Sequence, residues 1–420
     1  MGRFMTGAAT AAHQVEGNNT NSDCWVMENI PHSSYDEPSG MAVDHYHHFK
    51  EDIDLLADAG LNAYRFSIEW ARIQPTKDTW DEKEIAHYRE VIEYCISKDV
   101  TPIVTLHHFS SPKWLITEGG WENPEVVEYF RSYVARMAEE YKDILSYVCT
   151  INEANMRLQL AGLIKDMMAR MSKDTSNVQV GFNAVMENQK LMMMETAKAF
   201  GVQDPRTVAN FVSQCSPEGD LLVMKAHLAA KEELKKICPD VKVGLTLSLH
   251  DIHSVPGGEK MAEENWKEEF LHYLPYIEND DFLGVQCYTE KWFDENGVLP
   301  PNPEKPVTQM GYADEPEAIG SVIRTVAKDY KGTIIVTENG IATEDDNRRC
   351  EFIKEALDSV EECVKDGIPV EGYMYWSLLD NFEWQKGFAK TFGLIAVDRS
   401  TMIRKPKKSL EVLGNYKNEL

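Results

Sequence analysis

The chain has 420 residues, 43% of them hydrophobic and 10% aromatic, and its formal net charge is −26. This length is compatible with one large barrel of strands and helices or with two ordinary domains. The apolar content suffices for a sizeable core and argues against intrinsic disorder. Because nucleic acids and anionic membranes bind clustered Lys and Arg, the strong negative charge argues against both as partners.

Targeting and cofactor signals are absent from the sequence. No apolar run is long enough to span a bilayer, and the N-terminal residues lack the basic and apolar regions of a signal peptide. The eight cysteines show no C-x-x-C pair and no short zinc-type spacing. The sequence also lacks G-x-G-x-x-G, a phosphate-binding loop, G-x-S-x-G and H-E-x-x-H. We therefore expect a cytoplasmic protein with reduced thiols and without a nucleotide cofactor.

Eight β-rich segments recur along the chain, separated by segments with helical periodicity. The β-rich segments begin at Phe4, Ala63, Thr101, Ser146, Val241, Asp281, Thr333 and Val370. Several are almost continuously apolar, as expected of buried parallel strands. Eight such alternations, without a linker rich in Pro, Gly or Ser, predict an α/β fold in which residues 1–420 form a single (β/α)₈ TIM barrel domain. The alternative is a doubly wound open sheet, which would normally carry a phosphate loop after its first strand.

The region between the fourth and fifth strands is too long for one barrel crossover. It runs from Met156 to about Asp240, and eight of the 18 methionines lie in its first half, from Met156 to Met194. We expect a helical insertion above the barrel mouth. The methionines either fill the core of this insertion or form an adaptable apolar wall for part of a ligand.

Functional residues of such barrels lie at the carboxyl ends of the strands, where two glutamates stand out. Glu153 ends the fourth strand in TINEAN, and Glu338 ends the seventh strand in VTENG. Both follow apolar runs, where a carboxylate is costly unless it is used or paired. The two residues therefore form either an ion-paired structural cluster that closes the barrel top or an acid/base and nucleophile pair for a glycosidic bond.

Other side chains at the strand ends suit a sugar. Tryptophan offers a face for C–H bonds, and amide, imidazole and carboxylate groups can hold hydroxyls. The candidates from the strand ends are Gln14, Arg65, Glu69, His107, His108, Asn152, Tyr288, Trp376, Glu383 and Trp384. Of these, we expect Glu69 to be a barrel-rim residue paired with a neighbouring base.

With these motifs in view, the chain resembles the family-1 glycoside hydrolases, the β-glucosidase family. The resemblance covers both ends of the chain and most of the predicted barrel, but residues from about 164 to 218 have no match. The matching stretches are GAATAAHQVEG, DHYHHFKEDIDLLADAGLNAYRFSIEWARIQP, TPIVTLHHFSSPKWL, GWENPE, TINEAN, VTENGIA and WSLLDNFEWQKGFAKTFGLIAVDRSTMIRKPKKS.

The resemblance implies a retaining β-glucosidase without a cofactor or metal, acting on a small β-glucoside or a short β-linked oligosaccharide. It implies that Glu153 is the general acid/base and that Glu338 is the nucleophile, supported by Arg65. The residues it implies for substrate binding are Gln14, His108, Asn152, Tyr288, Trp376, Glu383 and Trp384. The aglycone, the tolerance for galactosides and fucosides, and the oligomeric state do not follow from the sequence.

Two departures from the family pattern lie beside the expected site. Ala154 follows Glu153 where the family usually has proline, which changes the turn but keeps the carboxylate. Gln286 stands two residues before Tyr288, at a position where asparagine is common. We therefore expect a contact to the substrate or to the nucleophile to be altered.

Three other hypotheses are weaker. A sugar-binding protein without turnover would be expected to lack one of the two glutamates, and both are present. A phosphoglycosidase needs cationic groups beyond the eighth strand, where Glu383 would repel a phosphate about 4 Å away by roughly 4 kcal/mol at a dielectric constant near 20. A metal site at His45, His47 and His48 is not expected, because sequential neighbours on a helix point in different directions.

Overall fold

The computed structural model describes residues 3–160, 162, 179–213 and 215–416. Within these residues, eight parallel strands close into a barrel in the order β1-β11-β10-β7-β5-β4-β3-β2. This closure confirms the predicted (β/α)₈ fold and rules out the open sheet. The barrel strands are β1 (Met5–Ala9), β2 (Ala63–Ser67), β3 (Thr101–His107), β4 (Tyr147–Ile151), β5 (Lys242–Ser248), β7 (Phe282–Gln286), β10 (Thr333–Asn339) and β11 (Val370–Trp376).

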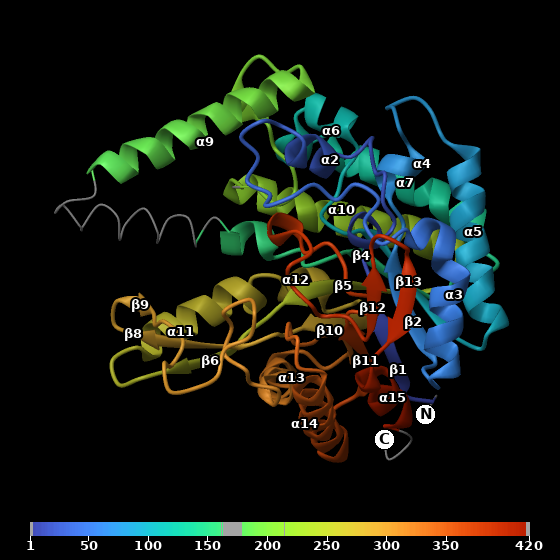
Figure 1. Ribbon diagram of the computed structural model, residues 1–420, viewed down its shortest axis with the longest axis vertical. Coiled ribbons are helices and arrows are strands. Elements are labelled where there is room, and N and C mark those ends of the chain that lie inside the picture. Colours follow the sequence, from blue (N-terminus) through green and yellow to red (C-terminus); the bar gives the residue numbers. More distant parts are fainter. Residues whose placement is uncertain (1–2, 161, 163–178, 214, 417–420) are drawn as a thin grey trace.

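Helices surround the barrel (Figure 1). The outer helices are α3 (His45–Asp58), α5 (Glu82–Ser97), α7 (Val126–Tyr141), α10 (Pro217–Ile237), α13 (Ala318–Asp329), α14 (Asp346–Lys365) and α15 (Lys408–Asn415). The side chains of Asp81 and Ser216 accept hydrogen bonds from the first turns of α5 and α10, which fixes where these helices begin. None of the helices in the described part of the chain is long and apolar enough to cross a membrane.

Shorter elements connect the barrel strands. The helices among them are α1 (Ala12–Val15), α2 (Asp23–Glu28), α4 (Trp70–Ile73), α6 (Lys113–Thr117), α11 (Glu259–Trp266), α12 (Leu274–Ile277), the 3₁₀ turns η1 (Gly120–Glu122), η2 (Pro205–Thr207) and η4 (Trp384–Lys386), and the π turn η3 (Lys267–Leu271). The short strands are β6 (Asp251–Ser254), β8 (Glu290–Asp294), β9 (Gly297–Val298), β12 (Ile395–Asp398) and β13 (Ile403–Pro406).

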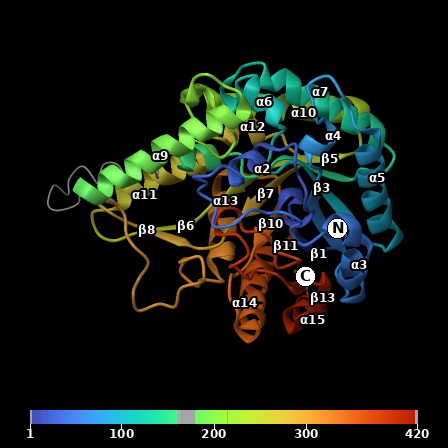
Figure 2. The same ribbon diagram turned by 45° about the horizontal axis from the view of Figure 1, so that its top comes forward.

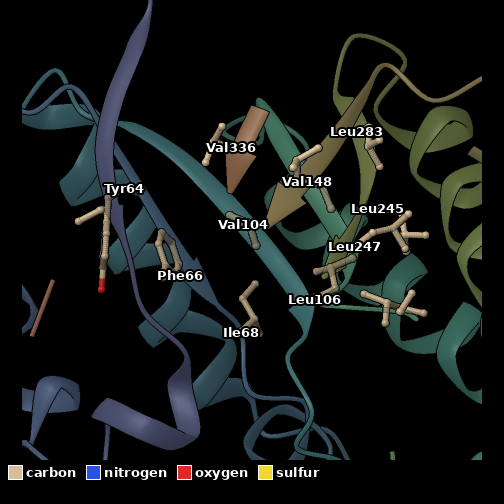
Figure 3. Packing of buried hydrophobic residues seen from close by; sticks show 14 of the residues in the cluster. Tyr64, Phe66, Ile68, Val104, Leu106, Val148, Leu245, Leu247, Leu283 and Val336 are labelled. Carbon is tan, nitrogen blue, oxygen red and sulfur yellow. The ribbon is translucent and has the colours of Figure 1, made fainter. Parts of the chain in front are cut away.

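The core has two parts because successive strand residues point to opposite faces of the barrel wall. The larger cluster includes Phe66, Val104 and Leu245 and packs between the strands and the outer helices (Figure 3). A smaller cluster contains Met5, Ile103 and other residues of the barrel interior. The strands are therefore buried on both faces, which explains their nearly continuous apolar sequences.

The expected helical insertion between β4 and β5 contains α9 (Gln179–Phe200), while α10 is the outer helix of this crossover. The C-terminal part of α9 lies beside α2 and α6, and its N-terminal end projects from the barrel (Figure 2). Met193 and Met194 are 43% and 53% exposed, so the helix-core interpretation is wrong for them. Met156 and Met192 are half-buried, while the side chains of Met167, Met168, Met171 and Met186 lie outside the described residues.

Candidate active site

The predicted site residues lie at or just beyond the carboxyl ends of the barrel strands. Arg65 is in β2, Glu338 in β10 and Trp376 in β11. His107 is the last residue of β3. The others follow β1, β3, β4, β7 and β11, and they are Gln14, His108, Asn152, Glu153, Tyr288, Glu383 and Trp384. Most are buried, whereas Tyr288, Glu383 and Trp384 are partly exposed. The barrel thus gathers residues that are far apart in sequence.

An irregularity in β10 turns Glu338 toward the barrel interior. Ile335 belongs to the inner cluster and Val336 to the outer one, so strict alternation would place Thr337 inside and Glu338 on the helix side. The pairing with β7 shifts between Val336 and Glu338, which leaves Glu338 opposite Gln286. Bulges of this kind are frequent next to active sites, where they re-aim a side chain.

The carboxylate of Glu338 accepts hydrogen bonds from three side chains. Arg65 donates to Oε1 at 2.5 Å, Gln286 donates to the same oxygen at 3.1 Å, and Tyr288 donates to Oε2 at 2.6 Å. Burial raises the pKa of Glu338, whereas the Arg65 charge and these three hydrogen bonds act in the opposite direction. Burial outweighs these contacts, so the pKa of Glu338 is raised above its usual range, but it is raised less than the pKa of Glu153. Of the two carboxyl groups, Glu338 is therefore the more readily ionised.

Glu153 has a different environment at the end of β4. Burial and the nearby charge of Glu338 raise the pKa of Glu153 well above its usual range, and the charge of Arg65 and a hydrogen bond with Ser248 oppose this shift only in part. Within the described residues, no cationic side chain forms an ion pair with Glu153, unlike Glu338 with Arg65. The protonated form of Glu153 is therefore favoured.

Asn152 connects several parts of the site. Its Oδ1 accepts hydrogen bonds from Arg65 at 2.5 Å and from Gln286 at 2.8 Å. Its Nδ2 lies 3.1 Å from Nε2 of His108. Burial lowers the pKa of His108 well below its usual range, so this imidazole is neutral. The neutral ring accepts from Asn152 through Nε2 and carries its proton on Nδ1.

A wall of aromatic rings and an acidic group lie beside the two glutamates. The ring of His108 is nearly parallel to Trp376, at 5.8 Å and 22°, and to Trp384, at 6.4 Å and 17°. Gln14 donates to the main-chain oxygen of Phe382 at 2.8 Å and to Glu383 Oε2 at 3.4 Å. Burial and the charge of Glu338 raise the pKa of Glu383 to about 8.

The structure also shows contacts that the sequence analysis missed. Thr246 bonds to Asn152, Gln286 and the backbone N–H of Glu153. Thr105 accepts a hydrogen bond from Arg65 Nε at 3.1 Å. The sequence signal for Thr246 was weak, since a threonine in a strand is usually a β-branched filler.

The expected pairing of Glu69 with a base is wrong. Glu69 caps α4 through the N–H of Ala71 at 3.2 Å and accepts from the Ser110 hydroxyl at 3.1 Å. Among the described residues it forms no ion pair, because the neighbouring base Arg72 binds Glu16 at 2.8 Å. Burial raises the pKa of Glu69 to about 7.

The three histidines of α3 each form their shortest ion pair with a different carboxylate, and His48 also lies 3.9 Å from Asp44. The pairs are His45 with Asp52 at 2.7 Å, His47 with Asp44 at 2.6 Å, and His48 with Glu51 at 2.9 Å. No cluster of three or more metal-binding side chains occurs in the parts of the chain that the structure describes.

A barrel whose mouth holds two buried glutamates beside tryptophan and amide groups is the arrangement of a glycosidase. The profile of glycosyl hydrolase family 1 matches residues 1–284 and 271–417, so the chain belongs to this family.

Relatives of known structure or sequence cover nearly the whole chain. The crystal structure of β-glycosidase BGL167 is 42% identical and has a TM-score of 0.89, covering 98% of this chain and 95% of its own. The β-glycosidase from Pyrococcus horikoshii is 30% identical with a TM-score of 0.78, covering 98% and 93%. β-Glucosidase A of Thermotoga maritima is 26% identical over 464 residues, covering 97% and 95%.

Proposed function

We propose that the protein is a retaining β-glucosidase in which Glu153 is the general acid/base and Glu338 is the nucleophile. The observation that carries this proposal is the difference between the two carboxyl groups. Glu338 accepts hydrogen bonds from Arg65, Tyr288 and Gln286, while burial and the charge of Glu338 raise the pKa of Glu153. A retaining glycosidase needs one ionised and one protonated carboxyl on opposite sides of the reacting bond.

The reaction then proceeds in two displacements. Glu338 attacks the anomeric carbon while Glu153 gives its proton to the leaving oxygen, which forms a glycosyl ester on Glu338. The ester carries no negative charge, so the pKa of Glu153 falls and its carboxylate can take a proton from the incoming water. Water attacks the anomeric carbon, releases the sugar with its β-configuration and restores both residues.

The side chains around the pair support recognition of an unphosphorylated sugar. In the described part of the chain, Gln14 Oε1 and His108 Nδ1 are buried and have no hydrogen-bond partner. They offer one acceptor and one donor to sugar hydroxyls. Asn152, Glu383 and Trp384 supply further polar groups, and the Trp376 indole supplies a face for the C–H bonds.

The choice of glucosides rests on the relatives, several of which are named β-glucosidases. We include galactosides and fucosides as secondary substrates to be measured beside glucosides. We further propose that residues 1–420 act as one catalytic domain in the cytoplasm. The eight cysteines, all within the described residues, are free, which supports a reducing compartment.

Azide products test the two roles. In Glu338→Gly, azide should occupy the vacated space and displace the leaving group of an activated aryl β-glucoside once, giving an α-glucosyl azide. In Glu153→Gly, the enzyme should form the glycosyl ester and azide should intercept it, giving a β-glucosyl azide after two inversions. Proton NMR of the anomeric position distinguishes the products.

Three results would contradict this proposal or part of it. Reversed azide anomers would exchange the roles of Glu153 and Glu338. A β-glucoside hydrolysed with inversion by the wild-type enzyme would rule out double displacement. A panel of aryl β-glucosides, galactosides, fucosides and 6-phosphoglucosides gives the sugar preference, and a preference for 6-phosphoglucosides would contradict the substrate class.

A further inference from the structure

The two glutamates are connected by a bridge of two side chains on neighbouring strands. Thr246 lies in β5, between β4 and β7 in the barrel, and Gln286 ends β7. Gln286 Nε2 lies 2.8 Å from Asn152 Oδ1, 3.1 Å from Glu338 Oε1 and 3.2 Å from Thr246 Oγ1, so its two N–H groups are shared among these three acceptors. Thr246 Oγ1 also accepts from the backbone N–H of Glu153 at 2.8 Å. A continuous path of hydrogen bonds thus runs from the Glu338 carboxylate to the Glu153 backbone.

The hydroxyl of Thr246 uses its full hydrogen-bonding capacity in this bridge. It accepts from Glu153 and Gln286, and it donates to Asn152 Oδ1 at 3.2 Å. A hydroxyl has one donor and two acceptor positions, so all three are occupied. Thr246 is completely buried, which means that water cannot replace a lost partner without a rearrangement.

The backbone of Glu153 needs such support. Its φ is +42°, in the left-handed region that non-glycine residues rarely adopt. A conformation of this kind persists only when its surroundings hold it. Thr246 provides two consecutive contacts, because its carbonyl also accepts from the N–H of Ala154 at 3.0 Å.

Ala154 and Gln286 both contribute contacts to this bridge. A proline at position 154 would have no N–H to give to Thr246, whereas Ala154 donates one. The amide of Gln286 contacts Asn152, Thr246 and Glu338 together.

We propose that Thr246 and Gln286 are positioning residues that fix the placement of Glu153 relative to Glu338. This inference rests on the roles proposed above for the two glutamates. Thr246 fixes the position of the Glu153 peptide, and Gln286 contacts both Thr246 and the carboxylate of the nucleophile Glu338. Neither residue exchanges protons or bonds with the substrate.

Thr246→Val tests the bridge, because valine keeps the shape of threonine but removes all three hydroxyl contacts. We expect kcat for aryl β-glucosides to fall about 10- to 100-fold, as for a misplacement of a reacting group by about 1 Å, with KM changed less than threefold. The basic limb of the pH profile should move to lower pH, since Glu153 displaced from Glu338 loses part of the repulsion that favours its protonated form. Thr246→Ser keeps the hydroxyl and should recover most of kcat.

Thr150→Val is the matched control. Thr150 is also completely buried, and its hydroxyl contacts His227 Nδ1 at 2.8 Å and the carbonyl of Gly244. It lies on β4 outside the bridge, so Thr150→Val should lower the unfolding temperature while kcat and the pH profile stay as in the wild type. Equal kinetic effects of Thr246→Val and Thr150→Val would reduce Thr246 to a structural role and overturn the proposal.

Gln286→Met provides a second, independent test, and it decides alone if Thr246→Val does not fold. Methionine keeps the length of glutamine without its donors, so we expect the same fall of kcat and the same acid shift of the basic limb. Because both residues act through one bridge, the double variant should lose little more than the worse single variant. Additive losses would contradict the bridge, and so would a wild-type pH profile in Gln286→Met.

The azide products keep this test separate from that of the proposed function. If Thr246→Val behaves as the wild type while Glu338→Gly and Glu153→Gly still give the α- and β-azides, only the bridge fails. If those azide products do not form, the catalytic roles fail first.

Discussion

The end of β10 and the end of β4 each place a glutamate at the barrel mouth, but the two glutamates have different surroundings. The bulge in β10 directs Glu338 toward Arg65 and Tyr288, which stabilise a carboxylate. The end of β4 directs Glu153 to a buried position without a cationic partner among the described residues, near the charge of Glu338. The comparison teaches that the surroundings, rather than the residue type, determine which glutamate attacks and which one carries the proton.

Removing the carboxylate at the end of β10 should have the largest effect. Glu338→Gln leaves no nucleophile, so kcat should fall on the order of 10⁶-fold, as when the nucleophile of another covalent enzyme is removed. The loss should be equally severe for good and poor leaving groups. Initial rates with a series of aryl β-glucosides measure it, and thermal unfolding shows whether Arg65, left without its partner, has destabilised the fold.

A strong dependence of the remaining rate on the leaving group would be inconsistent with the role of Glu338. It would mean that Glu153 alone still assists the departure of the leaving group without Glu338. The different surroundings of Glu153 and Glu338 would then not correspond to different catalytic roles.

Removing the proton donor at the end of β4 should have a smaller effect that depends on the substrate. Glu153→Gln should lower the rate about 10²- to 10⁴-fold for glucosides whose leaving group needs a proton. A dinitrophenyl glucoside leaves without one, so it should still glycosylate the enzyme and give a burst of phenolate before slow turnover. Stopped-flow absorbance measures the burst, and its absence together with uniform losses across substrates would contradict the assignment.

Glu383 has no part in the proposed acid/base or nucleophile roles, and we expect it to affect sugar binding. Two hydroxyls of a bound sugar would lose a partner in Glu383→Ala, at about 1–3 kcal/mol each, so kcat/KM for glucosides should fall about 30-fold or more. The measurement is kcat/KM for glucosides and 6-phosphoglucosides with both proteins. Unchanged glucoside values in Glu383→Ala would show that this carboxyl does not contact the sugar.

The barrel and the positions of the two glutamates could be predicted because both follow from local sequence. Buried parallel strands have long apolar runs, and a residue that ends such a run lies at the barrel mouth. The bulge before Glu338 could not be predicted, since it depends on how β10 pairs with β7. The same holds for Thr246, whose partners come from β4 and β7.

Glu69 and the methionines of α9 show a second limit of the sequence. Arg72 lay close enough in sequence to serve as the base for Glu69, but the fold places it against Glu16. The methionine-rich sequence around Met193 and Met194 is compatible with a helix core, but α9 extends from the barrel and leaves both side chains exposed. Several neighbouring residues can be candidates for contact with one side chain. Tertiary packing determines which contact forms, and the local sequence alone does not predict it.

The most specific consequence of the comparison is that the two carboxyl groups are electrostatically linked. At the separation of about 5.5 Å typical of retaining enzymes and an effective dielectric constant near 20, one negative charge contributes about 3 kcal/mol, or about two pKa units, to its neighbour. Glu338→Gln removes that charge, so the pKa of Glu153 should fall by about this amount while burial keeps it above its usual range. NMR titration of ¹³C-labelled carboxyl groups in Glu338→Gln and the wild type measures the difference, with Glu153→Gln used to assign the signal. Trapping the wild-type enzyme as a 2-fluoroglucosyl ester should lower the pKa of Glu153 similarly, because the ester also lacks the charge. A pKa of Glu153 that stays unchanged in both proteins would show that burial alone raises it, and the acid would then have no electrostatic reason to become the base in the second displacement.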